Sequence, residues 1–146
     1  AMDLHDCVEL SGALPVEEVR HEMERAKIFL FTSDRGEGWG VVLNEAMNSG
    51  CAVVAGEKIG AAPFLIKHGY NGLIFHDRNI EDLTRQVVHL LRNPQVASFI
   101  GQNAYESLCA EWSPEVAAKR FIELAEVLSV KSEPVNLWEE GPCSLI

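Results

Sequence analysis

The sequence predicts an α/β fold, a parallel sheet with flanking helices, and three observations support this prediction. Short continuous apolar runs have the composition of strands, and they lie at residues 28–32 (IFLFT), 51–55 (CAVVA) and 73–75 (LIF). Segments with helix start signals or helical spacing separate these runs. Alternating strands and helices indicate βαβ units, which form parallel sheets with right-handed connections.

The first elements are a short strand and a helix. Residues 7–10 (CVEL) form an apolar run that we interpret as a strand at an edge. A helix over about residues 15–25 follows, because the fixed φ of Pro15 and the early charges of Glu17 and Glu18 suit a helix N-terminus. The next run, 28–32, is apolar throughout, and we expect a strand buried on both faces.

The middle of the chain completes the sheet. A polar, glycine-rich loop over residues 33–40 (SDRGEGWG) leads into a helix that Gly50 ends. The run 51–55 is a second buried strand, in which Cys51 is a buried thiol. One or two helical turns near 62–69 and a tight turn precede the third strand at 73–75.

From residue 80 onward the pattern is helical. One apolar stripe recurs at three- and four-residue steps, at Ile80, Leu83, Val87 and Leu90. A second helix is expected over about 95–110, and a third begins at Ser113–Pro114 and ends near Val130. Residues 131–146 have no periodicity and are predicted to be a tail or strap, so the expected domain is 1–130.

Composition excludes several classes of protein. The chain has 146 residues and a formal net charge of −10, which disfavours binding to nucleic acid or to anionic lipid. Its apolar runs are far shorter than the roughly 20 residues of a membrane span, and its first residues do not resemble a secretory signal. Neither the four cysteines nor the five histidines have metal-ligand spacing. We therefore expect no metal and a reducing, cytoplasmic location.

The glycine-rich loop has the layout of an anion site. Gly38 and Gly40 allow the backbone to come close to a ligand. The free amides at Gly40, Val41 and Val42 begin the next helix and can donate to a phosphate or to sugar hydroxyls. The loop follows a strand, and ligands of open parallel sheets bind at the carboxyl ends of strands.

Two acids accompany this loop. Glu37 and Glu45 carry carboxylates, which accept paired hydroxyls such as those of a ribose or a second sugar. The same residues also fit a plain helix with an acidic start and a solvated glutamate. Local physics alone leaves these two interpretations about equal.

A wider pattern narrows the choice. The runs EGWGVVLNEAM, HGYNGLIF and DRNIEDL follow one another in order, within a stretch from about residue 7 to 128. Together they closely resemble the C-terminal, nucleotide-sugar-binding domain of family 4 glycosyltransferases, which are retaining enzymes of the GT-B fold. The resemblance implies that residues 1–130 are a partial, Rossmann-like donor-binding domain that lacks its first strands.

The resemblance also assigns roles to residues. Glu45 matches the glutamate that holds the nucleotide ribose, and Glu37 matches the catalytic-site glutamate that meets the hydroxyls of the donor sugar. The loop that wraps the sugar and the diphosphate matches Gly38, Trp39, Gly40, Val41 and Val42. The family in general needs no metal, and no cofactor is expected.

Several features depart from the family pattern. Trp39 replaces a phenylalanine, Phe64 replaces a frequent glutamate, and Ser33 lies one residue further from Glu37 than is common. The arginine and lysine that clamp the diphosphate, and the N-terminal acceptor domain, have no counterpart in the sequence. Cationic clamps stabilise the leaving group, so we expect this chain alone to be inactive and to bind nucleotide-sugar weakly.

The implied parent enzyme moves a glycosyl group from a nucleoside diphosphate sugar to an acceptor hydroxyl, in glycan, polysaccharide or glycolipid biosynthesis. Its acceptor, a glycan or a lipid-linked sugar, would bind through the N-terminal domain. Such an enzyme is cytoplasmic, with attachment to the inner membrane as an option. We expect no nucleic-acid partner.

Two alternatives remain open. The chain is a non-catalytic α/β binding or dimerisation module if a bare sheet edge pairs with a second copy. It is a glycosidase if Glu37 and Glu45 act as an acid and nucleophile pair, since they are separated by roughly 8–12 Å along the helix. The second alternative is weaker, because a helix N-terminus favours ionised Glu37, which is a poor proton donor.

Overall fold

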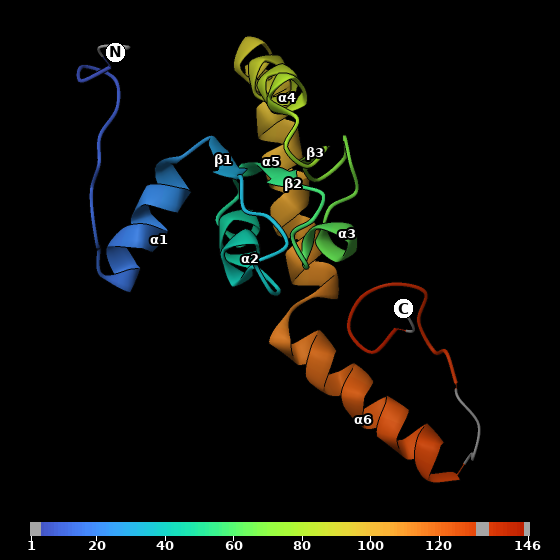
Figure 1. Cartoon of the computed structure of the whole chain (residues 1–146). Coiled ribbons are helices and arrows are strands. Elements are labelled where there is room, and N and C mark those ends of the chain that lie inside the picture. Colours follow the sequence, from blue (N-terminus) through green and yellow to red (C-terminus); the bar gives the residue numbers. More distant parts are fainter. Residues whose placement is uncertain (1–3, 131–134, 145–146) are drawn as a thin grey trace.

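The sheet of this protein is three-stranded and parallel. The computed structural model describes residues 4–130 and 135–144, and the strands lie in the order β1–β2–β3 (Figure 1). They are β1 (Ile28–Phe31), β2 (Ala52–Gly56) and β3 (Leu73–Phe75). In the register of the sheet, Leu30 is opposite Val54 and Val54 is opposite Leu73. The predicted α/β fold is confirmed.

Six helices in the described residues surround and extend this sheet. Their bounds are α1 (Val16–Arg25), α2 (Val41–Asn48), α3 (Ala62–Leu65), α4 (Ile80–Arg92), α5 (Pro94–Glu111) and α6 (Pro114–Val130). Each lies where the sequence predicts a helix, and α3 is a single turn. Asn79 caps α4, because its side-chain oxygen accepts a hydrogen bond from the amide of Asp82 at 2.9 Å.

Two hydrophobic clusters lie on opposite faces of β2. Val53 and Ala55 pack with α2, α3 and the second half of α5, whereas Ala52 and Val54 pack with α4 and the first half of α5. Both faces of β2 are therefore buried, as its apolar sequence predicts. Helix α5 belongs to both clusters because it crosses the amino end of β2, where Gly101 lies directly against the carbonyl of Gly50.

The expectation that residues 28–32 form a strand buried on both faces is wrong for β1. Leu30 is 46% exposed, and the other residues of β1 are only half-buried. The cause is position, because β1 lies at an edge of the sheet while α4 packs over β2 and β3. An apolar run therefore predicted the strand correctly and its burial incorrectly.

The strand expected at residues 7–10 is also absent. This segment is irregular, and Val8 and Leu10 are 51% and 93% exposed. Figure 1 shows it on the far side of α1 from the sheet. Because a strand needs a neighbour for its backbone hydrogen bonds, an apolar run without one among the described residues stays irregular.

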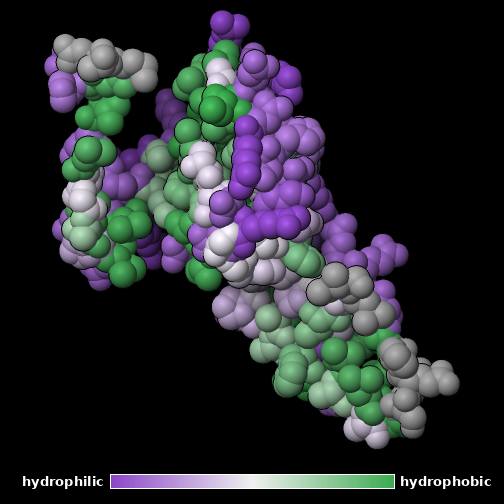
Figure 2. All heavy atoms as spheres, viewed as in Figure 1, coloured by the Kyte–Doolittle hydropathy of each residue, from purple (hydrophilic) through white to green (hydrophobic). Residues whose placement is uncertain are grey.

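Helix α6 leaves the body of the molecule (Figure 1) and contains no buried residue. Its exposed apolar side chains are Phe121, Ile122, Leu128 and Val130, and Figure 2 shows apolar colouring gathered at this lower end of the molecule. No helix in the described part of the chain is long and apolar enough to cross a membrane.

The described part of the tail, residues 135–144, returns along α6. Arg120 lies 5.3 Å from the centroid of the Trp138 ring, and its guanidinium donates to the carbonyl of Glu140 at 2.5 Å. Lys67 forms an ion pair with Glu140. Residues 135–144 thus contact α6 and Lys67, whereas residues 131–134 and 145–146 of the predicted tail lie outside the described part of the chain.

Candidate functional site

The glycine-rich loop joins β1 to α2, and Gly40 fixes its last turn. Gly40 is buried and has a φ of +84°, in the left-handed region that side chains rarely adopt. A Cβ at this position would lie 2.8 Å from the ring of Phe31 and 3.0 Å from Ile59. Position 40 therefore requires glycine for both conformation and space.

This loop packs on the loop that follows β2. The amide of Ala61 donates to the carbonyl of Trp39 at 2.8 Å. Gly60 lies so close to the carbonyl of Gly38 that a side chain would not fit between them. The loops after two neighbouring strands thus meet at the carboxyl edge of the sheet, which is where a ligand of an open parallel sheet binds.

The first amides of α2 are free to donate. The amide of Leu43 bonds to the carbonyl of Gly40 at 2.9 Å. Among residues 4–130 and 135–144, no acceptor pairs with the amides of Gly40, Val41 and Val42. Free amides and the positive end of the helix dipole favour an anion at this place.

Glu37 is half-buried in a closed turn. Its carboxylate accepts a hydrogen bond from the hydroxyl of Ser33 at 3.3 Å, and its amide donates to the carbonyl of Asp34 at 3.0 Å. The side chain of Asp34 accepts from the amide of Gly36 at 2.8 Å. The unusual spacing between Ser33 and Glu37 is therefore accommodated by a turn that Asp34 closes.

Glu45 is exposed on α2 and borders two hollows. One, of about 160 Å³, lies between α1 and α2 and is lined by Val16, Val19, Arg20, Met23, Glu45, Asn48 and Ser49. The other, of about 270 Å³, lies against the junction of α5 and α6 and is lined by Asn44, Glu45, Asn48, Leu108, Cys109, Trp112, Ser113 and Pro114. Glu37 lines neither of these two hollows, so the two acids predicted from the sequence do not share one.

Trp39 lies in an aromatic cluster that the sequence does not predict. Its indole N–H donates to the side-chain oxygen of Asn44 at 2.9 Å. The centroid of its ring lies 5.5 Å from that of Phe64 and 5.9 Å from that of Trp112. These rings come from distant positions in the chain, and no local spacing pattern signals their contact.

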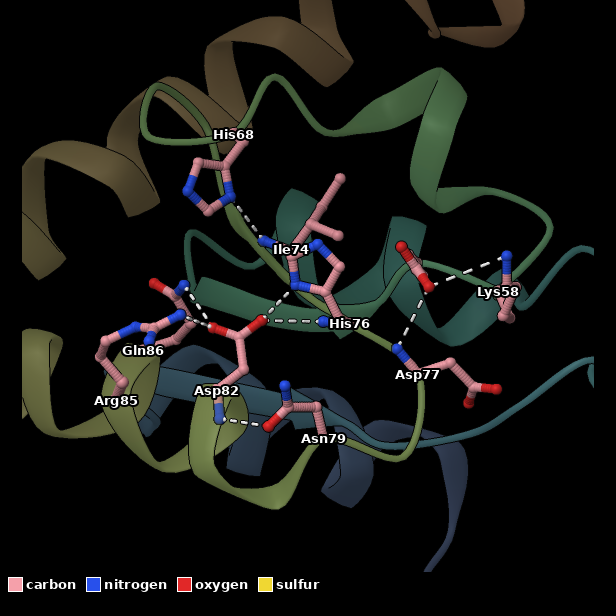
Figure 3. Close-up of polar contacts among 10 residues, drawn as sticks. Lys58, His68, Ile74, His76, Asp77, Asn79, Asp82, Arg85 and Gln86 are labelled. Carbon is pink, nitrogen blue, oxygen red and sulfur yellow. Dashed lines mark hydrogen bonds and ion pairs between the residues drawn. The ribbon is translucent and has the colours of Figure 1, made fainter.

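Basic groups near the loops are held by neighbours. Lys58 (Figure 3) forms an ion pair with Glu57 at 3.7 Å. His68 accepts a hydrogen bond from the amide of Ile74 at 3.0 Å. The hydrogen bond with Glu140 raises the pKa of Lys67.

A second polar cluster lies after β3, around the carboxylate of Asp82 (Figure 3). Asp82 is 2% exposed. It accepts hydrogen bonds from the amide of His76 at 2.9 Å and from Arg85 and Gln86 at 2.5 and 3.1 Å. The His76 ring lies 2.7 Å away, through Nδ1. The backbone hydrogen bond from His76, followed by that ring contact, holds the pKa of Asp82 well below its usual range.

The Asp82 cluster closes the loop between β3 and α4, and Asn79 of this loop lines a hollow together with Ser33 and Asp34 of the glycine-rich loop. The sequence signal of the cluster is a capping pattern, in which Asn79 precedes α4 and Asp82 lies three residues later in the first turn. That signal predicts the start of a helix, and it contains nothing that predicts the bonds from His76.

The fold is that of the C-terminal domains of GT-B glycosyltransferases. Staphylococcus aureus TarM, solved with UDP, is 27% identical with a TM-score of 0.70, and the match covers 83% of this chain and 24% of that one. Anabaena HepE, solved with UDP and glucose, is 25% identical with a TM-score of 0.62, over 88% of this chain and 33% of that one. A sucrose-phosphate synthase from Thermosynechococcus elongatus, 24% identical, has a TM-score of 0.72, over 87% of this chain and 31% of that one.

The sequence matches over residues 1–107 the family described as glycosyl transferases group 1, and the chain belongs to this family. It is 29% identical to an exopolysaccharide phosphotransferase of Streptomyces coelicolor, over 96% of this chain and 15% of that protein. It is 30% identical to an amylovoran biosynthesis glycosyltransferase of Erwinia amylovora, over 87% of this chain and 32% of that protein. The chain thus spans a third or less of the length of these relatives.

Proposed function

We propose that this chain is the donor-binding part of a retaining glycosyltransferase, which moves a glycosyl group from a nucleoside diphosphate sugar to an acceptor hydroxyl. One observation carries the proposal: Gly40, in a left-handed conformation, starts α2 with unpaired amides at the carboxyl edge of the sheet. Family membership supports the reaction class. The UDP named with two of the similar structures supports a nucleotide donor.

In this proposal the nucleoside occupies the hollow between α1 and α2. The carboxylate of Glu45 would accept the ribose hydroxyls. Val16 and Val19 line the same hollow and are 83% and 36% exposed, so they offer an apolar surface to the base.

The diphosphate would lie on the free amides of Gly40, Val41 and Val42, where the helix end favours negative charge. Glu37 would meet the hydroxyls of the donor sugar. Both glutamates would then position the donor, and neither would be a nucleophile. Neither hollow beside Glu45 includes Glu37, which argues against the glycosidase alternative, since that chemistry needs two carboxylates across one sugar.

The chain alone is proposed to be inactive and to bind weakly. The amides of α2 carry only partial charge, whereas electrostatic stabilisation of the leaving group usually contributes more than any other effect to such catalysis. The acceptor, a glycan or a lipid-linked sugar, would bind elsewhere in the whole protein, which we place in the cytoplasm or at the inner membrane. The names of the relatives support this acceptor class, since they include exopolysaccharide, amylovoran and phosphatidylinositol monomannoside.

Saturation-transfer NMR and calorimetry with UDP, GDP and ADP test the proposal. We expect one of the three to bind with a dissociation constant weaker than about 1 μM, and Glu45→Gln to weaken it about tenfold through the loss of a charged ribose acceptor. Glu126→Gln, on the exposed surface of α6, is the matched control. Absence of binding by all three at millimolar concentration, or equal effects of both substitutions, would contradict the assignment.

A second candidate function, dimerisation through the sheet, rests on the edge strand β1. Leu30 is 46% exposed on this strand, and an open edge can pair with another copy. This function does not exclude donor binding, and it has its own test at the level of the whole molecule.

A further inference from the structure

The aromatic cluster at the glycine-rich loop joins three separate parts of the fold. Trp39 belongs to the loop itself, Phe64 to α3, and Trp112 ends α5 just before α6 begins. The Trp39 ring lies between the other two, at centroid distances of 5.5 Å to Phe64 and 5.9 Å to Trp112, with interplanar angles of 32° and 45°. These are favourable distances for tilted aromatic pairs.

Trp39 is held by four contacts. Besides its two ring contacts, its indole N–H bonds to Asn44 at 2.9 Å, and its carbonyl accepts from Ala61 at 2.8 Å. Gly38 and Gly40, on either side of it, have no side chains, so Trp39 supplies the side-chain contacts of this part of the loop.

The cluster differs from ordinary core packing. Trp39 and Phe64 are 38% and 41% exposed, so burial alone accounts for only part of their placement. Trp112 is half-buried, and it lines the hollow that Glu45 also borders. The cluster therefore lies beside the candidate site.

We infer that Trp112 is a positioning residue for the glycine-rich loop. It contacts Trp39, and through Trp39 it holds the amides of Gly40, Val41 and Val42 in the arrangement that would receive a diphosphate. The ligand part of this inference rests on the proposed function. The mechanical part, from Trp112 to the loop, depends only on the contacts described above.

Hydrogen exchange followed by NMR tests the mechanical part. In Trp112→Leu we expect exchange of the hydrogen-bonded N–H groups at the loop, which are the Trp39 indole and the amides of Leu43 and Ala61, to rise about threefold to tenfold. Exchange in β2 should stay unchanged. Trp112→Phe keeps a ring and should restore slow exchange, and Trp138→Leu, whose ring contacts Arg120 instead, is the matched control.

Calorimetry tests the ligand part with three pairs of probes: uridine and UDP, guanosine and GDP, adenosine and ADP. Trp112→Leu should lower the affinity for the nucleoside diphosphate that the wild-type chain binds, by about threefold to tenfold. It should leave the matching nucleoside unchanged, because the α1–α2 hollow lies outside the cluster. If the wild-type chain binds none of the six, the proposed function fails, and the exchange experiment still decides the role of Trp112.

Three results would overturn the inference. The first is unchanged exchange of the Trp39 indole N–H and of the Leu43 and Ala61 amides in Trp112→Leu. The second is an equal rise in β2, which would mean general destabilisation. The third is equal weakening of nucleoside and diphosphate, which would mean that Trp112 acts on the whole site and not on the loop.

Discussion

Gly40 decides where α2 begins. Its left-handed backbone turns the chain away from β1, and the neighbouring Phe31 and Ile59 leave no room for a methyl group. Gly38, two residues earlier in the same loop, has nothing within 4 Å of the place where a Cβ would be. The two glycines therefore have different roles, although the sequence presents them alike.

We expect Gly40→Ala to lower the free energy of unfolding by about 1–3 kcal/mol, through the positive φ and the close contacts. Gly38→Ala, the matched control, should change it by less than about 1 kcal/mol. Urea denaturation followed by circular dichroism measures both. Equal losses would mean that Gly40 is not under the constraint described.

The cysteines differ in reactivity for a physical reason. Cys51 is fully buried and its thiol donates to the carbonyl of Met23 at 3.1 Å. Burial raises the pKa of Cys51, which lowers the thiolate fraction that reacts. Cys7 and Cys109 are exposed.

We expect a thiol reagent at pH 8 to label Cys7 and Cys109 in the folded protein and to label Cys51 only after denaturation. Peptide mass spectrometry after timed labelling measures each site. Labelling of Cys51 at the rate of Cys109 under native conditions would contradict the burial of Cys51 at the start of β2.

At the scale of elements, the start of α4 depends on one carboxylate. Asp82 is ionised in the folded protein at neutral pH, because the bonds from His76, Gln86 and Arg85 hold its pKa below the usual value. In the unfolded chain the pKa of an aspartate is about 3.9. The stabilisation from Asp82 is therefore complete well above that pH, and it is lost as the pH falls through the folded pKa.

We expect Asp82→Asn to lower the melting temperature at pH 7, with a difference from wild type that narrows below about pH 4. Thermal unfolding at several pH values measures this difference. Glu81→Gln, an exposed neighbour in the same helical turn, is the control and should show no such narrowing. A difference that stays constant from pH 7 to pH 3 would contradict the role of the charge.

The sequence predicts elements better than it predicts their surroundings. The run 51–55 and the stripe at Ile80 and Leu90 located β2 and α4, because strand and helix patterns are local. The exposure of Leu30 was not predictable from its own segment, since it depends on what lies beside β1. The same holds for the irregular residues 7–10.

The candidate site likewise has features that the local sequence predicts and contacts that it does not. Gly38 and Gly40 lie in the predicted loop, because a strand end, glycines and a helix start are consecutive in the sequence. The contact of Trp39 with Trp112 joins residues more than seventy positions apart, and no local pattern encodes it. The predicted functions of Glu37 and Glu45 stay predictions.

At the scale of the whole molecule, net charge opposes the association of two copies, whereas the open edge of β1 favours it. Two copies, each with a net charge of −10, repel at low salt, and salt screens this repulsion. The exposed backbone of an edge strand with Leu30 on it favours association.

We therefore expect the mass measured by light scattering to rise from monomer toward dimer when salt is raised to about 0.5 M. Leu30→Lys, which places a charge on the edge strand, should keep the chain monomeric. Leu91→Lys is the matched control, since Leu91 is an exposed leucine on α4. A strict monomer at every salt concentration would count against dimerisation.

Helix α5 has a consequence for how the molecule melts. Its residues Ala97 and Ile100 contribute to one hydrophobic cluster and Ala104 and Leu108 to the other, on either side of the contact between Gly101 and Gly50. Neither cluster can unfold without disrupting helix α5, which contributes residues to both. The two sides of the sheet should therefore lose their structure together, in a single calorimetric peak, even though their clusters have no residue in common.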